Sequence, residues 1–112
     1  MTTLVIPNFD NRVSPRLDYA ESLQLVTIEK KKIVKRETIK LLVHSNLERL
    51  NIITRLEPNI LICDGISDLS KQKFLENNIE VICWVHGEID TIIKNFIAGN
   101  LKVHKAEKHK NN

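Results

Sequence analysis

Soft metal ligands and turn-forming residues follow two apolar runs in the second half of the chain. Residues 59–62 lead directly into Cys63-Asp64-Gly65, and residues 81–85 lead into His86-Gly87. Thiolate sulfur and imidazole nitrogen are side-chain atoms that hold iron–sulfur clusters and soft metal ions. Cys63 and His86 are therefore the first candidates in this sequence for binding a metal.

These two groups should lie together, because the elements around them predict parallel strands. Pro58 ends the helical pattern before the first run, and Ser67 can cap a helix that separates the two runs. A strand–helix–strand unit places its strands parallel, and open sheets of this kind bind ligands beyond the carboxyl ends of the strands. The sequence therefore predicts that Cys63, His86 and their neighbours share one edge of a sheet.

The first half of the chain predicts three strands. Residues 4–6 form an apolar run that should stop at Pro7, because proline donates no hydrogen bond to a neighbouring strand. Two β-rich segments, 22–28 and 33–39, should form a hairpin around a charged turn. The long loop before the hairpin, residues 8–21, should be anchored by its apolar residues Val13, Leu17 and Tyr19.

Three helices complete the pattern. A capping box at Ser45 and Glu48 begins the first, Ser67 begins the second, and an apolar stripe over residues 88–98, with Gly99 behind it, marks the third. The order β-β-β-α-β-α-β-α is typical of a three-layer α/β/α sandwich around a mixed five-stranded sheet. We expect residues 1–101 to form this single domain and residues 102–112 to be a flexible basic tail.

Charge and hydropathy exclude some classes of protein. The last twelve residues, with four lysines against Glu107, carry the whole formal charge of +3, so residues 1–100 are neutral and no nucleic-acid-binding face is expected. No apolar run approaches the ~20 residues of a membrane span, and the segment before Pro7 is too short for a signal peptide. We therefore expect a cytoplasmic protein whose cysteines, Cys63 and Cys83, are free thiols.

Five short motifs occur in one order along the chain: Ile6-Pro7, Arg12-Val13-Ser14-Pro15, Ile62-Cys63-Asp64-Gly65-Ile66, Gly87 with Ile89-Asp90, and the final run from Phe96 to Leu101. Together they resemble the dinitrogenase iron–molybdenum cofactor-binding family, which contains small NifX-like proteins and the cofactor-binding part of NifB. The resemblance covers nearly the whole chain up to Leu101. It implies a ribonuclease-H-like α/β/α fold and a role in holding or carrying iron–sulfur or iron–molybdenum clusters, with metallocofactor assembly proteins as partners.

The resemblance directs attention to the ends of the two parallel strands and to the arginine-bearing loop. Its candidate cofactor site comprises Arg12, Arg16, Cys63, Asp64, Gly65, His86 and Gly87. Two soft ligands, Cys63 and His86, cannot complete a four-thiolate site, so a cluster would be docked transiently. Cys63 is the preferred thiol, because the start of the following helix can lower the pKa of a nearby cysteine.

Other interpretations of the same residues remain open. The two cysteines can be small buried hydrophobic residues, and the two arginines can be ordinary solvated side chains. Asp10 and Asp64 could hold Mg²⁺ for a nuclease-like reaction if their strands are neighbours, although such an enzyme needs a third carboxylate and a basic substrate face. A third class is a protein-interaction domain with neither cluster nor catalysis. The sequence leaves the oligomeric state undecided.

Overall fold

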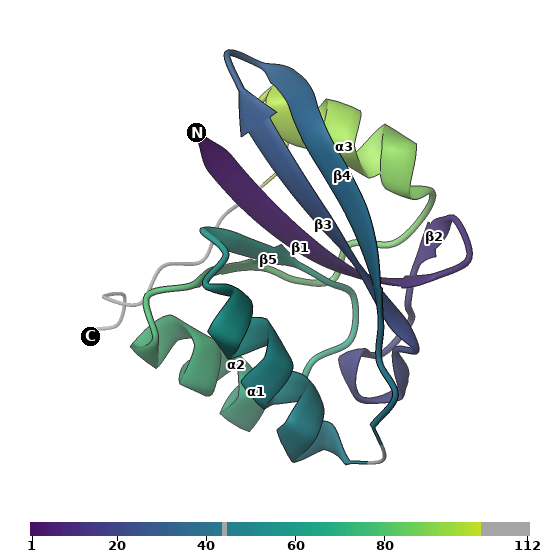
Figure 1. Cartoon of the computed structure of the whole chain (residues 1–112), viewed down its shortest axis with the longest axis vertical. Helices are drawn as coiled ribbons and strands as arrows, with labels where there is room; N and C mark the ends of the chain where they lie inside the picture. Colours follow the sequence, from purple (N-terminus) through teal and green to yellow (C-terminus); the bar gives the residue numbers. More distant parts are fainter. Residues whose placement is uncertain (44, 102–112) are drawn as a thin grey trace.

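A mixed sheet with helices on both of its faces forms the body of the protein (Figure 1). The computed structural model describes residues 1–43 and 45–101, so the predicted tail at 102–112 lies outside the described residues. The helices are α1 (Asn46–Leu56), α2 (Asp68–Glu76) and α3 (Ile89–Ile97), and a 3-10 turn, η1, covers Leu17–Tyr19. None of these helices is long and apolar enough to cross a membrane. The strands in the described residues are β1 (Thr2–Phe9), β2 (Arg12–Val13), β3 (Ser22–Glu29), β4 (Lys32–Lys40), β5 (Ile60–Ile62) and β6 (Glu80–Ile82).

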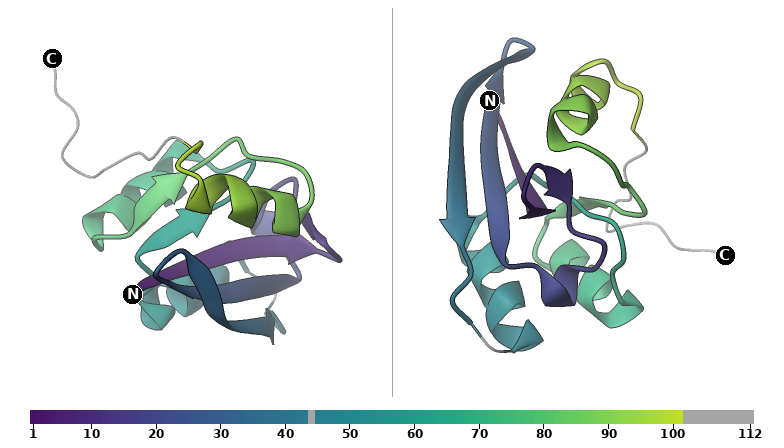
Figure 2. Two further views of the ribbon diagram at one scale, coloured as in Figure 1. Left: turned by 90° about the horizontal axis from the view of Figure 1, so that it is seen from above. Right: turned by 90° about the vertical axis from the view of Figure 1, so that its right-hand side faces the viewer.

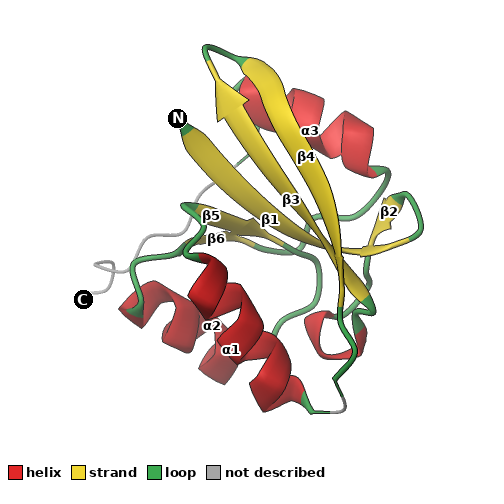
Figure 3. Cartoon of the chain, in the orientation of Figure 1, coloured by secondary structure: helices red, strands yellow, loops and turns green. Residues whose placement is uncertain are grey.

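The sheet has an antiparallel half and a parallel half. In the described chain the strand order is β4-β3-β1-β5-β6, and β2 pairs with β1. Strand β3 is antiparallel to both of its neighbours, β4 and β1. Strand β5 is parallel to both of its neighbours, β1 and β6 (Figure 3). The predicted mixed sheet and the parallel relation of the strands before Cys63 and His86 are thereby confirmed. Strand β2 is an additional strand that the sequence did not predict.

Successive residues of β1 supply opposite faces of the sheet, as the alternation of side chains along a strand requires. Val5 belongs to the core beneath α1 and α2, whereas Leu4 and Ile6 belong to the core beneath α3. The ribbon views show the same division, with α1 and α2 on one side of the strands and α3 on the other (Figure 2). Strand β1 is therefore buried from both sides.

Serine residues begin α1 and α2 at the predicted positions. The hydroxyl of Ser45 accepts a hydrogen bond from the N–H of Glu48 at 3.1 Å, and that of Ser67 accepts one from the N–H of Ser70 at 3.1 Å. Each cap satisfies a backbone donor at the helix start, a contribution of about 1 kcal/mol. Helix α1 leads into β5 and α2 leaves it, so both helices begin at the carboxyl edge of this strand.

Strand β1 does not stop at Pro7, contrary to the prediction. It continues to Phe9, and Pro7 lies opposite Leu23 of β3. The carbonyl oxygen of Pro7 accepts a hydrogen bond of 2.9 Å from the N–H of Ser14, on the side of β1 away from β3. The backbone nitrogen and oxygen of one residue point to the same side of a strand, so the nitrogen of Pro7 also points away from β3. On that side the pairing of β1 with β5 has already ended, so the lack of an N–H at Pro7 breaks no hydrogen bond to β5.

The long loop is anchored by two of its three predicted apolar residues. Val13 and Leu17 are buried, but Tyr19 is 71% exposed. The Tyr19 ring instead lies under the guanidinium of Arg16, 5.6 Å from its carbon atom. An aromatic ring can therefore remain at the surface of this loop through contact with a cation.

Replacing Ile93 tests the packing of α3. Ile93 is 2% exposed in the core beneath α3, whereas Phe96, which the sequence also directs at the sheet, is half-buried. Ile93→Ala leaves a cavity, so the free energy of unfolding measured with urea should fall by about 2–5 kcal/mol. Thr91→Ala, on the exposed side of the same helix, should change it by less than about 0.5 kcal/mol. Equal effects of the two substitutions would contradict this orientation of α3.

Candidate functional site

Backbone hydrogen bonds join the arginine-bearing loop to the end of β5 at Gly65. The N–H of Gly65 donates to the carbonyl of Pro15 at 2.9 Å, and the N–H of Leu17 donates to the carbonyl of Gly65 at 3.0 Å. A Cβ atom on residue 65 would lie 2.9 Å from the carbonyl oxygen of Pro15. Because that oxygen belongs to the backbone, glycine is needed for the approach. The pairing places residues 12–17 over the carboxyl end of β5.

A second set of backbone bonds joins the same loop to the segment after β6. The N–H of Val13 donates to the carbonyl of Gly87 at 3.0 Å, and the N–H of Ile89 donates to that of Asn11 at 2.9 Å. Gly87 has a φ of +117°, and no atom lies within 4 Å of the place that a Cβ would occupy. The space beside its Cα atom is therefore unoccupied by protein atoms. We call the three joined segments, 11–17, 63–66 and 84–89, the carboxyl-edge site.

Trp84 interrupts the ladder between β5 and β6 just past their ends. The N–H of Cys63 donates to the carbonyl of Ile82 at 2.9 Å, but the carbonyl of Cys63 accepts from Val85 at 3.0 Å, one residue later than an unbroken parallel ladder requires. The extra residue is Trp84, which has a φ of 62° and is 67% exposed. The predicted strand at 81–85 therefore ends at Ile82. Bulges of this kind gather next to binding sites.

Trp84 lies within the carboxyl-edge site but was not predicted there from the sequence. Left-handed positions are usually occupied by glycine or asparagine, and a tryptophan after four apolar residues is more typical of a buried strand. No local signal in the sequence indicates the bulge. Its side chain nevertheless gives the carboxyl-edge site a large exposed aromatic surface.

The two cysteines lie in the opposite arrangement from the one predicted. Cys63 is 1% exposed, and burial, followed by the neighbouring Cys83, raises the pKa of its thiol far above the usual range. Cys83 is half-buried just beyond the end of β6. The expected lowering of the Cys63 pKa by the following helix is therefore not found, because the apolar core excludes the water that would stabilise its thiolate.

The arginine and histidine side chains of the site lie at the surface. Arg12 and His86 are exposed, and within residues 1–43 and 45–101 Arg12 makes no side-chain hydrogen bond or ion pair. Arg16 instead donates two hydrogen bonds to Asp18, at 3.1 and 3.2 Å. These bonds hold the pKa of the Asp18 carboxyl below its usual range. Arg12 is therefore the cation of the site that is more available to a ligand.

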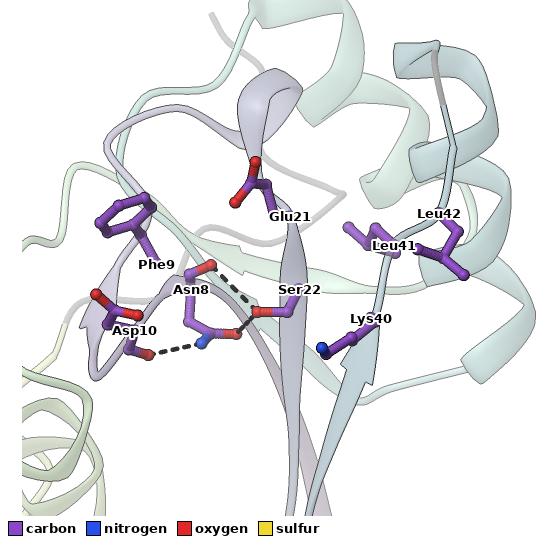
Figure 4. A pocket seen from close by; sticks show the side chains of 8 residues that line it. All are labelled: Asn8, Phe9, Asp10, Glu21, Ser22, Lys40, Leu41 and Leu42. Atoms are coloured by element: carbon purple, nitrogen blue, oxygen red, sulfur yellow. Dashed lines mark hydrogen bonds between the residues drawn. The ribbon is translucent and has the colours of Figure 1, made fainter.

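Asp10 lines a pocket of about 410 Å³ between the ends of β1 and β4 and the start of β3 (Figure 4). Its backbone oxygen accepts a hydrogen bond from the side chain of Asn8, which in turn accepts one from Ser22. Asp64 does not line this pocket. Across the described residues, no group of three or more His, Cys, Asp or Glu could hold a metal ion. A third carboxylate beside Asp10 and Asp64 is therefore missing from that part of the chain.

Solved structures of other proteins share this fold. PH0822 superposes with a TM-score of 0.83 at 26% identity, over 90% of this chain and 93% of that one. MJ0327 of Methanocaldococcus jannaschii, provisionally named a dinitrogenase, gives 0.75 at 21% identity over 93% and 96%. The apo form of the orange protein from Desulfovibrio gigas gives 0.76 at 15% identity over 93% of each chain. No protein-family model matches the sequence, and no curated protein is significantly similar to it. These likenesses establish a shared fold.

Gly65→Ala tests the contact between the loop and β5. The added methyl group would collide with the carbonyl of Pro15, so the free energy of unfolding should fall by about 1–3 kcal/mol. Hydrogen exchange at the N–H of Leu17 should accelerate, because its acceptor is the carbonyl of Gly65. Gly87→Ala is the comparison, since it strains a positive φ without a collision and should leave Leu17 protected. Unchanged protection of Leu17 in Gly65→Ala would show that the contact tolerates a side chain.

The thiols should differ in their reaction with iodoacetamide. At about pH 8, Cys83 should be alkylated at least ~10-fold faster than Cys63, because burial and a raised pKa keep the Cys63 thiol protonated and covered. Mass spectrometry of peptides at timed intervals measures both rates. In denaturant the two rates should become similar. A faster reaction at Cys63 in the folded protein would contradict the observed burial.

Proposed function

We propose that the protein binds an anionic cluster of the iron–sulfur or iron–molybdenum type at the carboxyl-edge site and carries it between metallocofactor assembly proteins. The main support is that exposed Arg12 and His86 lie at one edge of the sheet, on segments that backbone hydrogen bonds join to the end of β5. The shared fold adds support, since one structural neighbour bears a nitrogenase name and another is described in an apo form. We also propose that the fold is of the ribonuclease-H-like type.

The groups of the site supply different attractions to such a cargo. The exposed imidazole of His86 binds an iron atom, and Cys83 offers the thiol that is closer to the surface. The guanidinium of Arg12 donates hydrogen bonds to the sulfides or organic acid of an anionic cluster. Cys63 does not contact the cargo in this proposal, because its side chain is buried.

Three further residues shape the site through their backbones and local pairs. The carbonyl of Asp64 accepts a hydrogen bond from Trp84 at 3.1 Å, which steadies the bulge, and Gly65 holds the loop in place. The Arg16 guanidinium is paired with Asp18 at 3.1 Å. These residues position the binding groups, whereas His86 and Arg12 make the contacts.

The donor set predicts a short residence time. A resident cluster is held by four protein ligands, and the described residues contain no group of three or more potential ligands. The remaining coordination must come from ligands that the cluster brings with it or from a partner protein. Weak and incomplete coordination suits a carrier, because the cluster can be released without breaking a closed shell of protein ligands.

Cluster uptake under anaerobic conditions tests the proposal. The apo protein is offered a preformed iron–sulfur cluster held by small-molecule thiolates, and retained iron and charge-transfer absorption are measured after gel filtration. His86→Ala should lower uptake at least ~5-fold and Cys83→Ala should lower it to a similar degree, because each removes one of two soft ligands. Cys63→Ala is the matched control and should retain uptake. No uptake by the parent protein, or equal uptake by the His86 variant, would favour a cluster-free interaction domain.

Replacing Arg12 tests the electrostatic part of the site. Arg12→Ala should weaken uptake several-fold at low salt and much less at high salt, because a charge–charge attraction between exposed groups is screened. Arg55→Ala removes another exposed arginine, in the last turn of α1 at the opposite end of the strands, and is the control. If both variants lose uptake equally, net charge rather than Arg12 attracts the cargo.

A further inference from the structure

Cys63 and Cys83 directly follow the paired ends of the neighbouring strands β5 and β6. The parallel register of β5 and β6 pairs Ile62 with Ile82. The N–H of Cys63 donates to the carbonyl of Ile82 at 2.9 Å, the bond that a parallel Ile62–Ile82 pair makes, so Cys63 and Cys83 are the next residues along the two strands. Cys63 therefore lies beside Cys83, just before the bulge interrupts the ladder.

Both thiols point to the same face of the sheet. Cys63 belongs to the core beneath α1 and α2, and Cys83 packs against that core. Adjacent strands lie ~4.8 Å apart. A thiolate–metal bond of about 2.3 Å, as in zinc sites, is close to half of that spacing. An ion that accepts two sulfurs in a line therefore fits between the two side chains.

We propose that Cys63 and Cys83 together bind a soft monovalent d¹⁰ cation, of which Cu(I) is the biological example. Soft thiolates select Cu(I), and this ion is satisfied by two of them. Zinc requires four ligands in a structural site, and the described residues supply no group of three. This site goes beyond the cluster-carrier function, because it uses Cys63 and requires neither His86 nor the arginines.

Binding changes protonation but not oxidation state. Each thiol loses one proton and forms one sulfur–copper bond, so two protons are released and the bis-thiolate complex carries one negative charge. Lys71 of α2 favours the ionised form of Cys63 and so opposes part of the penalty for burying this charge. Half-buried Cys83 provides the entry for the ion, and buried Cys63 then holds it away from water.

The test measures Cu(I) binding to the full chain in the absence of iron. Under anaerobic conditions the protein competes with bicinchoninate, a chelator whose coloured Cu(I) complex fades as the protein withdraws the ion. The parent for this experiment carries His104→Asn and His109→Asn, which remove two imidazoles from the C-terminal sequence. It should withdraw about one Cu(I) per chain, and its apparent affinity should rise with pH because binding releases protons.

Variants then separate this site from the cluster site. In the same parent, Cys63→Ala and Cys83→Ala should each lower the Cu(I) affinity at least ~10-fold, whereas His86→Ala should not change it. Iron-cluster uptake should instead fall in His86→Ala and be retained in Cys63→Ala, so the two proposals can fail separately. Melting temperatures show whether each variant is folded. The rate of alkylation tests the site in a protein that keeps both cysteines. Bound Cu(I) should protect Cys83 from iodoacetamide.

Four outcomes would overturn the copper site. They are no withdrawal of Cu(I) by the parent, undiminished affinity in either cysteine variant, and alkylation of Cys83 at the same rate with and without copper. The fourth is a disulfide between Cys63 and Cys83 after copper addition, which mass spectrometry detects as the loss of two hydrogen atoms and which would indicate oxidation rather than binding.

Discussion

The close approach of two backbones at Gly65 is the constraint on which the site depends. The loop at 12–17 lies over the end of β5 because Gly65 leaves room for the carbonyl of Pro15. The same loop places Leu17 in the core beneath α1 and α2, and it pairs Arg12 with the residue that precedes α3. The glycine at position 65 therefore links the packing of Leu17 in the core to the position of the exposed Arg12.

Features that depend on neighbours in the sequence were predictable from it. The serine caps of α1 and α2 are hydrogen bonds within three residues, and the spacing of Ile89, Ile92 and Ile93 determines which face of α3 is buried. The parallel relation of β5 and β6 followed from the helix that connects them. Because that relation places the strand ends at one edge, the convergence of residues after β5 and β6 was also predictable.

Features that depend on distant segments were not predictable in the same way. Pro7 fits inside β1 because β5 ends early, which no pattern around Pro7 indicates. Cys63 is buried because residues from η1, α1 and α2 share its core, although its position after a strand and before a helix is equally typical of an exposed ligand. Sequence patterning therefore located the edge of the sheet that carries the site, but the choice of the exposed thiol required the tertiary packing.

The bulge at Trp84 decides which side chains the carboxyl-edge site presents. In an unbroken strand Val85 would share the face of Cys83, since residues two positions apart point the same way. The inserted residue shifts this alternation, and Val85 packs against the core beneath α3 instead. Cys83 is consequently the last side chain of the segment to face the core beneath α1 and α2, and the chain then leads to the exposed His86. A left-handed tryptophan costs about 1–2 kcal/mol, and the shifted alternation leaves Cys83 against the core beneath α1 and α2 and His86 at the surface.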